Sequence, residues 1–431
     1  MKLPFLSRLP IRGLFLLACL GLMLLAACRP APSAPPLQQT TITALIWAPD
    51  WPEEMLRIAA EFDKLNPDAR VNVQFMIGNS VEQNIKPRVA SGNLPDLMSV
   101  NPNPYTAALA NQGVLVDLGA SAAWHNMLDN LKGDWSSSNN IHFGIPSGVA
   151  TTLIYFNQSM FAQAGIRRLP GNFSEFLQVC QQLRRAGFTP MILDGGFPNM
   201  LGNGPFSSGF ANNVVALQPA WKQKMADGSL NLDTAQTADI FGKMQLLVRR
   251  GYVQNDYMET DYDDGIRLFN QGQAAMTFQG SWAAGLLMHN PGFHTGVLIP
   301  PWNPPGKIVV PVIGSETGLA VCNTAKQNVA RRFLEFMLGR GFSIMQNKRR
   351  NISPFKFNQG PVLVDPQLLA YTRTVAAFPR TSSLYYTYLP ANTIDQLHPL
   401  LQDVLRGRIT AEQAARLLDA SIKQQAEMNY K

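Results

Sequence analysis

The sequence from residue 41 to residue 100 decides the fold: it reads TITALIWAPDWPEEMLRIAAEFDKLNPDARVNVQFMIGNSVEQNIKPRVASGNLPDLMSV. The apolar run at its start predicts a strand over 41–47. Apolar side chains then recur at helical spacing, and Asp50 and Glu53 have the spacing of an N-cap and its reciprocal partner. Strands at 71–75 and 97–100 with a helix between them complete the pattern, which predicts an α/β fold whose parallel sheet is covered on both faces.

The rest of the chain continues this alternation. Strands are expected at 152–157, 190–193 and 275–279, and amphipathic helices are expected at Phe173, Phe333 and after Thr410. Asn172 with Glu175, and Thr410 with Gln413, have the spacing of caps at the start of two of these helices. The length of 431 residues is too great for one ordinary domain and suits two. With 46% hydrophobic and 15% charged residues, the composition is that of a globular protein and argues against disorder.

The first 28 residues predict export. Three basic residues precede an apolar run at 13–25, which has the length of a signal peptide and is too short for a comfortable membrane span. The run ends in LAAC at 25–28, which matches the bacterial lipobox and predicts a lipid on Cys28. The Pro-rich segment 29–39 is expected to be an extended tether. We therefore expect a protein anchored by lipid outside the cytoplasm, in the periplasm or at the cell surface; an apolar anchor with an incidental cysteine is the alternative.

Motifs of catalysis and of metal binding are missing from the sequence. It contains no phosphate-binding loop, no His-Glu-x-x-His and no Gly-x-Ser-x-Gly. His289 and His294 lie beside a Pro-Gly turn and are a weak metal signal, so neither metal nor cofactor is expected. The formal net charge of +7 is spread without a basic, aromatic-rich run, which excludes nucleic acid as an expected partner. Cys180 and Cys322 could pair, but two separate buried thiols are the preferred interpretation.

The segment FNQGQAAMTFQGSWA at 269–283 resembles the family 1 extracellular solute-binding proteins, the group of the maltose-binding protein. In that family a helix ending in Phe-x-x-Gly leads into an Ala-Met strand and then Gly-x-Trp. Further segments agree with the family in order and spacing: LPDL at 94–97, GVLVDL at 113–118, GIP at 144–146, YFN at 155–157, FAQAG at 161–165 and FLEFM at 333–337. The resemblance covers roughly residues 41 to 425.

This resemblance implies a two-lobed, type II periplasmic-binding-protein-like fold with a ligand cleft between the lobes. The implied N-terminal lobe comprises 40–147 and 313–358, and the C-terminal lobe comprises 148–312 and 359–431. It further implies a monomeric receptor without catalysis, which captures a sugar or oligosaccharide by lobe closure and delivers it to the permease of an ABC importer. A signalling receptor for the same solute is not separated from this by the sequence.

Ligands of open α/β sheets lie beyond the carboxyl ends of the strands, and sugars need flat aromatic faces together with polar groups. This rule, with the resemblance, selects the candidate ligand-binding residues Trp47, Asp50, Trp51, Asn101, Asn103, Tyr105, Asp194, Gly195, Phe197, Ser281, Trp282, Ser315, Glu316, Tyr385 and Tyr386. Trp282, which follows Gly-Ser at the end of a strand, is predicted to be the main stacking surface, with a place in the core as the alternative. Trp47 could equally belong to the core, and Asp50 could serve only as a helix cap.

Two other functions remain open at this point. A receptor for a polyol phosphate would use Arg349 or Arg350 to hold the phosphate, although both are expected at the surface. A lipid-anchored glycoside hydrolase would need two carboxylates facing each other, and Asp50 and Asp194 are the available pair. Maltose-type relatives carry an acidic residue that is replaced around Ala150 here, so the resemblance does not imply maltose as the solute.

Overall fold

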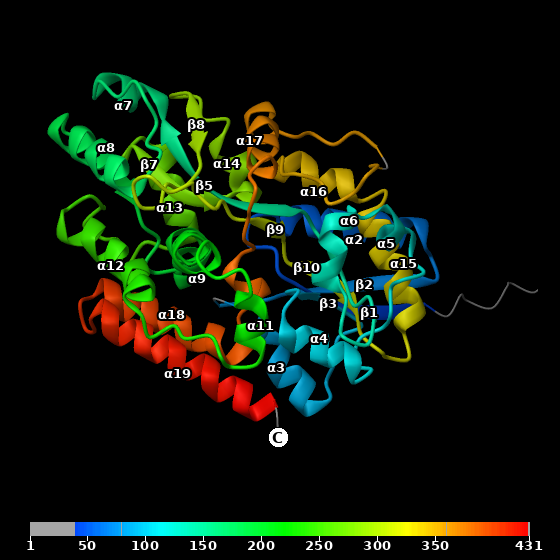
Figure 1. The fold of residues 1–431 in the computed structure, drawn as a ribbon. Coiled ribbons are helices and arrows are strands. Elements are labelled where there is room, and N and C mark those ends of the chain that lie inside the picture. The colour runs from blue at the N-terminus through cyan, green and yellow to red at the C-terminus, as the bar shows by residue number, and fades with distance from the viewer. Residues whose placement is uncertain (1–38, 79, 359, 430–431) are drawn as a thin grey trace, which may run out of the picture. The chain divides into compact units, whose positions relative to one another are not determined.

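The computed structural model describes residues 39–78, 80–358 and 360–429 (Figure 1), and the chain from residue 40 onward forms one compact unit. The expected signal peptide, the lipid on Cys28 and most of the 29–39 tether lie outside the described residues. Within the described part of the chain, no helix has both the length and the apolar composition needed to cross a membrane.

The strands predicted at 41–47, 71–75 and 97–100 are confirmed and belong to the first of two sheets. Its order is β2-β1-β3-β10-β4, with β1 parallel to β2 and β3, and with β10 antiparallel to β3 and β4. The strands are β1 (Thr40–Ile46), β2 (Ala69–Phe75), β3 (Leu97–Val100), β4 (Ile145–Pro146) and β10 (Gly318–Val321). A late segment of the chain thus completes the sheet begun by the first sixty residues of the unit.

The helices around this sheet are α2 (Pro52–Leu65), α3 (Val81–Ser91), α4 (Pro104–Asn111), α5 (Ala122–Asn126), α6 (Asp129–Lys132), α15 (Gln327–Leu338) and α16 (Phe342–Arg349), with a 3-10 turn at Gly133–Trp135. The apolar faces of α2 and α15 meet where the rings of Phe62 and Phe333 lie edge to face, with centroids 5.1 Å apart. We call this sheet with its helices the first half.

The second sheet has the order β6-β7-β5-β8, and we call it with its helices the second half. Its strands are β5 (Val149–Asn157), β6 (Met191–Ile192), β7 (Met276–Gly280) and β8 (Thr295–Leu298). β5 is antiparallel to β7 and β8, and β6 is parallel to β7. The predicted strands at 152–157, 190–193 and 275–279 are therefore confirmed, but the first begins three residues earlier and the second is shorter.

The second half contains most of the helices (Figure 1). They are α7 (Gln158–Gln163), α8 (Phe173–Arg185), α9 (Pro198–Leu201), α10 (Ser207–Phe210), α11 (Trp221–Ala226), α12 (Ala235–Arg249), α13 (Tyr262–Asn270), α14 (Ala284–Leu287), α17 (Pro366–Ala376), α18 (Ala391–Leu405) and α19 (Ala411–Asn429). A π-helical turn at Gly202–Phe206 joins α9 to α10, and a second one at Ala211–Val215 continues α10. 3-10 turns lie at Ser281–Ala283 and Tyr385–Thr387.

Most predicted helix caps are confirmed, but one is wrong. Thr410 and Gln413 cap α19 reciprocally, and the Asn172 side chain accepts from the backbone N–H of Glu175 at the start of α8. Asp50 does not cap α2: the N-cap is Trp51, and no side chain caps this helix. The reason is that an arginine, described below, binds the Asp50 carboxylate.

Each half has its own hydrophobic core. One cluster fills the first half, with Trp135 fully buried, and two clusters fill the second half around the fully buried Trp302 and Tyr155. Cys180 lies in a cluster of the second half and Cys322 in that of the first, and both are buried free thiols, as preferred from the sequence. The residue boundaries of the lobes stay a prediction.

The segments that connect the halves lie side by side. β9 (Ile313–Ser315) pairs with the start of β5, and the backbone N–H of Val149 donates to the carbonyl of Ile352 at 3.0 Å. Three connections therefore meet at one place, and the ends of several strands from both sheets border the cleft beside it.

Candidate ligand-binding cleft

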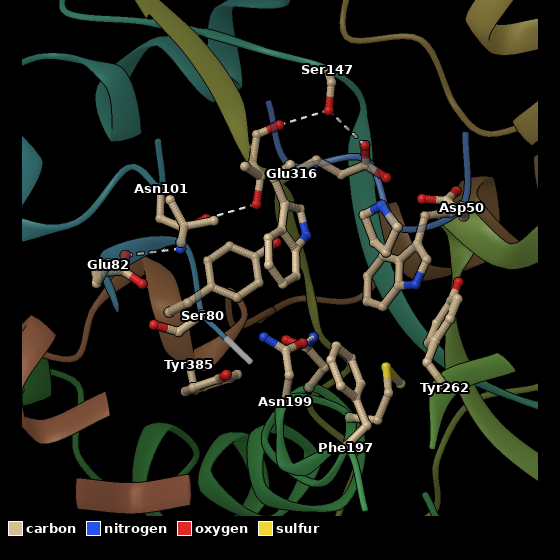
Figure 2. A pocket seen from close by; sticks show the side chains of 18 of the residues that line it. Asp50, Ser80, Glu82, Asn101, Ser147, Phe197, Asn199, Tyr262, Glu316 and Tyr385 are labelled. Atoms are coloured by element: carbon tan, nitrogen blue, oxygen red, sulfur yellow. Dashed lines mark hydrogen bonds between the residues drawn. The ribbon is translucent and has the colours of Figure 1, made fainter. Parts of the chain in front are cut away.

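A cleft with an empty space of about 720 Å³, part of it open to solvent, lies between the two halves (Figure 2). The first half and the connections contribute Trp47, Pro49, Asp50, Trp51, Ser80, Val81, Glu82, Asn101, Ser147, Glu316, Thr317 and Arg349. The second half contributes Phe197, Asn199, Met200, Asn203, Tyr262, Trp282, Tyr385, Tyr386 and Ile394. Both halves therefore supply a wall, which is the arrangement of a site that closes around a ligand.

A buried ion-pair cluster forms one side of the cleft. Arg349, at the end of α16, donates from Nε to Asp50 Oδ2 at 2.9 Å and from Nη1 to Glu316 Oε2 at 2.8 Å. The three side chains are only 4–5% exposed. Burial alone would lower the pKa of Arg349, but the Asp50 and Glu316 carboxylates raise it above its ordinary value. The expectation that Arg349 lies at the surface is wrong, and its charge is already matched by two carboxylates.

Glu316 holds the connecting segments together. Ser147 Oγ donates to Glu316 Oε2 at 3.0 Å and to the Thr317 carbonyl at 2.6 Å, and Asn351 Nδ2 donates to Glu316 Oε1. Gly148 passes so close that an added Cβ would lie 2.7 Å from Glu316 Oε2, which explains the glycine at this position. The Glu316 carboxylate thus joins its own segment to two others that are distant in sequence, one with Ser147 and one with Asn351.

A third buried carboxylate, Glu82, lies at another part of the cleft (Figure 2). Its Oε1 accepts from Asn101 Nδ2 at 2.9 Å and from Asn103 Nδ2 at 2.7 Å, and Asn101 Oδ1 in turn accepts from Thr317 Oγ1 at 2.7 Å. Burial raises the pKa of Glu82, and the hydrogen bonds from the two amides lower it by less. The network links the start of α3, the segment after β3 and the segment after β9.

Aromatic rings supply the apolar surface of the cleft. Trp282 is partly exposed and packs against both clusters of the second half. The Trp282 ring lies against Gly280. A Cβ added to Gly280 would lie 2.1 Å from the ring, so only glycine leaves room for the ring in this position. Trp47 is also partly exposed, whereas Trp51 and Tyr386 are 4% and 7% exposed. The partly exposed rings are the ones available for stacking on a solute.

Tyr385 is fixed by a buried histidine. The hydroxyl of Tyr385 lies 2.7 Å from His398 Nε2 on α18, and the Tyr386 hydroxyl donates to the Ser315 carbonyl at 3.2 Å. Burial lowers the pKa of His398 to about 4 from 6.5. The imidazole is therefore neutral in the folded protein at neutral pH, and it orients the phenol that borders the cleft.

The His398 pKa predicts a pH-dependent loss of stability. Because the unfolded chain binds the proton more readily, stability is full above pH 6.5 and falls as the pH drops towards about 4. His398→Gln should remove up to roughly 3 kcal/mol of this dependence while keeping a partner for Tyr385. Urea unfolding of both proteins at about pH 7.5 and about pH 4.5 measures the difference, in which the other titrating groups largely cancel. Equal losses in both proteins would contradict the assignment.

Nine of the fifteen predicted residues line the cleft, and their roles as ligand contacts stay predictions. They are Trp47, Asp50, Trp51, Asn101, Phe197, Trp282, Glu316, Tyr385 and Tyr386. The expectation that adjacent strands end at a common site brought most of them together. For Asp50 and Glu316, however, the structure shows engagement with Arg349, so their carboxylates are less available to a solute than their place in the sequence suggested.

The other six predicted residues do not line the cleft. Asn103 caps α4, and the Lys86 ammonium group lies 5.9 Å from the ring centre of Tyr105. The backbone N–H of Gly195 donates to the Tyr257 carbonyl. Ser281 donates to the Val149 carbonyl, and Ser315 donates to Asp134.

Asp194 is the sixth of these residues, and its position removes the hydrolase hypothesis. It is 3% exposed, does not border the cleft, and accepts from Gln279 Nε2 at 2.9 Å. Asp50, its intended partner, is paired with Arg349. The two carboxylates therefore do not face each other across a substrate space.

Glu82 and Tyr262 line the cleft but are not predicted there, and Arg349 is predicted there only under the polyol phosphate alternative. Ser80 and Glu82 follow β2, so the strand-end rule applies to them as well, but their segment also has the pattern of a helix start. Burial, with the nearby Asp50 carboxylate, raises the pKa of Tyr262, whose hydroxyl has no hydrogen-bond partner among the described residues. No local signal distinguished Arg349 from the exposed basic residues beside it.

Comparison with known proteins decides the family. Residues 48–341 match the family described as bacterial extracellular solute-binding protein. The chain belongs to this family. The predicted membership is thus confirmed, and it makes this solute-binding protein an extracytoplasmic receptor and not an enzyme.

Relatives of this solute-binding protein are distant in sequence and close in fold. A multiple sugar-binding protein of Streptococcus mutans is 22% identical over 335 residues, which are 75% of this chain and 77% of the relative. A sugar transporter protein of Bacillus licheniformis in complex with stachyose has a TM-score of 0.76 at 14% identity, covering 89% of this chain and 100% of that one. RafE in complex with raffinose has a TM-score of 0.74 at 20% identity, covering 90% and 100%. The predicted type II two-lobed α/β fold is confirmed.

Proposed function

We propose that this protein is the receptor of an ABC importer for a sugar or oligosaccharide. The observation that carries the proposal is the pairing of partly exposed aromatic rings, Trp47 from the first half and Trp282 from the second, around one cleft with polar groups between them. Flat apolar rings suit the C–H faces of sugar rings, and amide, carboxylate and phenol groups suit their hydroxyls. The names of the relatives, which include raffinose and stachyose complexes, support the same class of solute.

Binding would act through closure of the two halves. A solute that contacts both walls interacts more strongly with the closed arrangement than with an open one, and so increases the closed population. The permease would then distinguish the loaded receptor from the empty one by the relative position of the halves. Nothing in this cycle requires a covalent step, and a single receptor molecule suffices for it.

A thermal-shift screen tests the class of solute. The full-length protein is heated with raffinose, stachyose, maltotriose, xylotriose and diacetylchitobiose in separate samples. A ligand at 100 times its Kd stabilises the native state by about 2.7 kcal/mol, which raises the melting temperature by several degrees. We expect at least one neutral oligosaccharide to do so. A shift with inorganic phosphate or glycerol phosphate, and with none of the sugars, would replace this function with the polyol phosphate alternative.

The polyol phosphate alternative has little support in the cleft. Arg349, the only arginine or lysine among the lining residues, is matched by Asp50 and Glu316. Arg350 does not line the cleft, and its Nη1 lies 2.8 Å from His289 Nε2. No cationic side chain of the lining is thus left for a phosphate group.

The protein is further proposed to be held at the membrane by a lipid on Cys28. LAAC at 25–28, between an apolar run and a Pro-rich segment, is the basis of this assignment. In cells that express the full chain, Cys28→Ala should abolish incorporation of a labelled fatty acid and release the protein from the membrane fraction or leave it unprocessed. Cys19→Ala is the matched control and should be labelled like the parent chain. Undiminished labelling of the Cys28 variant would disprove the anchor.

A further inference from the structure

Glu82 is an incompletely paired carboxylate in the wall of the cleft. Its side chain belongs to a residue that is 1% exposed, and both amide hydrogen bonds go to Oε1. Oε2 has no hydrogen-bond partner among the described residues, although Glu82 borders the cleft. A buried carboxyl oxygen without a hydrogen-bond partner is costly, so we expect the solute to supply this partner.

Lys86, the nearest cationic residue on the same helix, binds partners other than Glu82. Lys86, one turn after Glu82 in α3, donates from Nζ to Asp395 Oδ2 at 2.6 Å and to Asn392 Oδ1 at 2.9 Å, both on α18 of the second half. Ser80, at the start of α3, accepts from the backbone N–H of Gln83. The neighbours of Glu82 on its own helix therefore make their bonds away from its free oxygen.

The charge of the residues that line the cleft disfavours an acidic solute. Asp50, Glu82 and Glu316 are its carboxylates, and Arg349 is its only guanidinium or ammonium group. The net charge of the lining is negative whether Glu82 is ionised or protonated, because Asp50 and Glu316 together exceed Arg349. An acidic solute would enter a negative field in a partly dehydrated space and find no free cation to compensate.

We propose that Glu82 determines specificity: its Oε2 accepts a hydrogen bond from a hydroxyl or ammonium group of the bound saccharide, and the cleft excludes saccharides that carry carboxylate or phosphate. The solute class is thereby narrowed to neutral and amine-bearing sugars. This inference rests on the proposed function, since it takes a saccharide as the ligand. The ring of Tyr385, on the opposite wall, borders the same part of the cleft as Glu82 and Ser80 (Figure 2).

Calorimetric titration of the full protein with probes that differ in charge tests the exclusion. The neutral probes are those of the thermal-shift screen, the amine-bearing probe is the fully deacetylated chitosan trimer, and the acidic probes are trigalacturonate and glucose 6-phosphate. We expect binding of a neutral or an amine-bearing probe and none of the acidic ones. An acidic probe that binds as tightly as the best neutral probe overturns the inference and leaves the proposed function standing. Failure of every saccharide overturns both.

A variant then assigns the effect to this residue. Glu82→Gln keeps the shape but puts an amide donor where Oε2 was an acceptor, so affinity for the best non-acidic probe should fall about tenfold or more. Glu54→Gln, which changes another buried glutamate of the first half that does not line the cleft, is the control and should bind normally. Unchanged affinity of Glu82→Gln overturns the inference. If this variant is unstable, the charged-probe series on the parent protein still decides the exclusion.

Discussion

Arg349→Met is expected to lower the free energy of unfolding by about 3 to 5 kcal/mol, which is the usual loss when one partner of a buried ion pair is removed. The substitution leaves the Asp50 and Glu316 carboxylates buried without their counter-charge, since Arg349 donates to both. Methionine has a similar length and no polar group, so a packing defect adds little. Urea unfolding at neutral pH measures the change, and the slope of the transition should stay constant.

Arg332→Met is the matched control for this prediction. Arg332 binds Asp68 through two nitrogens at 2.7 and 3.0 Å, but both side chains are more than 40% exposed. Exposed ion pairs of this kind contribute little to stability, because water screens the two charges, so the loss should be small. Equal, small losses in the two variants would show that the Arg349 cluster is accessible to water and would contradict its description as a buried centre.

Trp282→Ala is expected to weaken binding of the cognate sugar by about 1 to 3 kcal/mol, judged from the apolar area that a large ring can bury against a ligand. In the structure the ring is only partly exposed and packs against two core clusters, so stability should fall as well. This dual loss refines the expectation from sequence, which treated stacking and core packing as alternatives. Calorimetric titration and a melting curve on the same protein give the two quantities.

Trp221→Ala separates the two effects. Trp221 is 6% exposed in the same half, packs edge to face on Phe210 and Tyr388, and does not line the cleft. Truncation of a buried tryptophan costs about 3 to 5 kcal/mol of stability, and ligand affinity should be retained. If both variants lose stability and neither loses affinity, Trp282 is a core residue and the stacking role is wrong.

The alternation of strands and helices could be predicted from sequence because it depends on local periodicity. β3 was predicted with both ends correct, and Asn172 and Thr410 were placed at caps because their partners lie three residues away. Asp50 had equally good cap spacing and failed, since its partner Arg349 lies 299 residues away. An ion pair between residues so far apart does not affect the local sequence pattern, so it could not be predicted from that pattern.

The same limit explains the candidate site. The rule that ligands lie beyond strand ends selects aromatic and polar residues, and six of these border the cleft: Trp47, Asp50, Trp51, Asn101, Phe197 and Trp282. Ser281 also follows a strand end and Ser315 is the last residue of β9, but their hydroxyls donate to the Val149 carbonyl and to Asp134. The direction of a side chain at a strand end depends on contacts with the opposite half of the protein. It therefore cannot be predicted from the periodicity of one segment.

The two cysteines described above have a chemical consequence for a protein that works outside the cytoplasm. Burial raises the pKa of Cys322 to about 12 and raises that of Cys180 as well, and the thiols lie in different clusters. The thiolate is the form that attacks a disulfide, so neither cysteine of the folded protein is a ready substrate for thiol exchange. Folding of residues 40–431 then requires no disulfide catalyst, and capture of the solute is insensitive to the redox state of the surroundings.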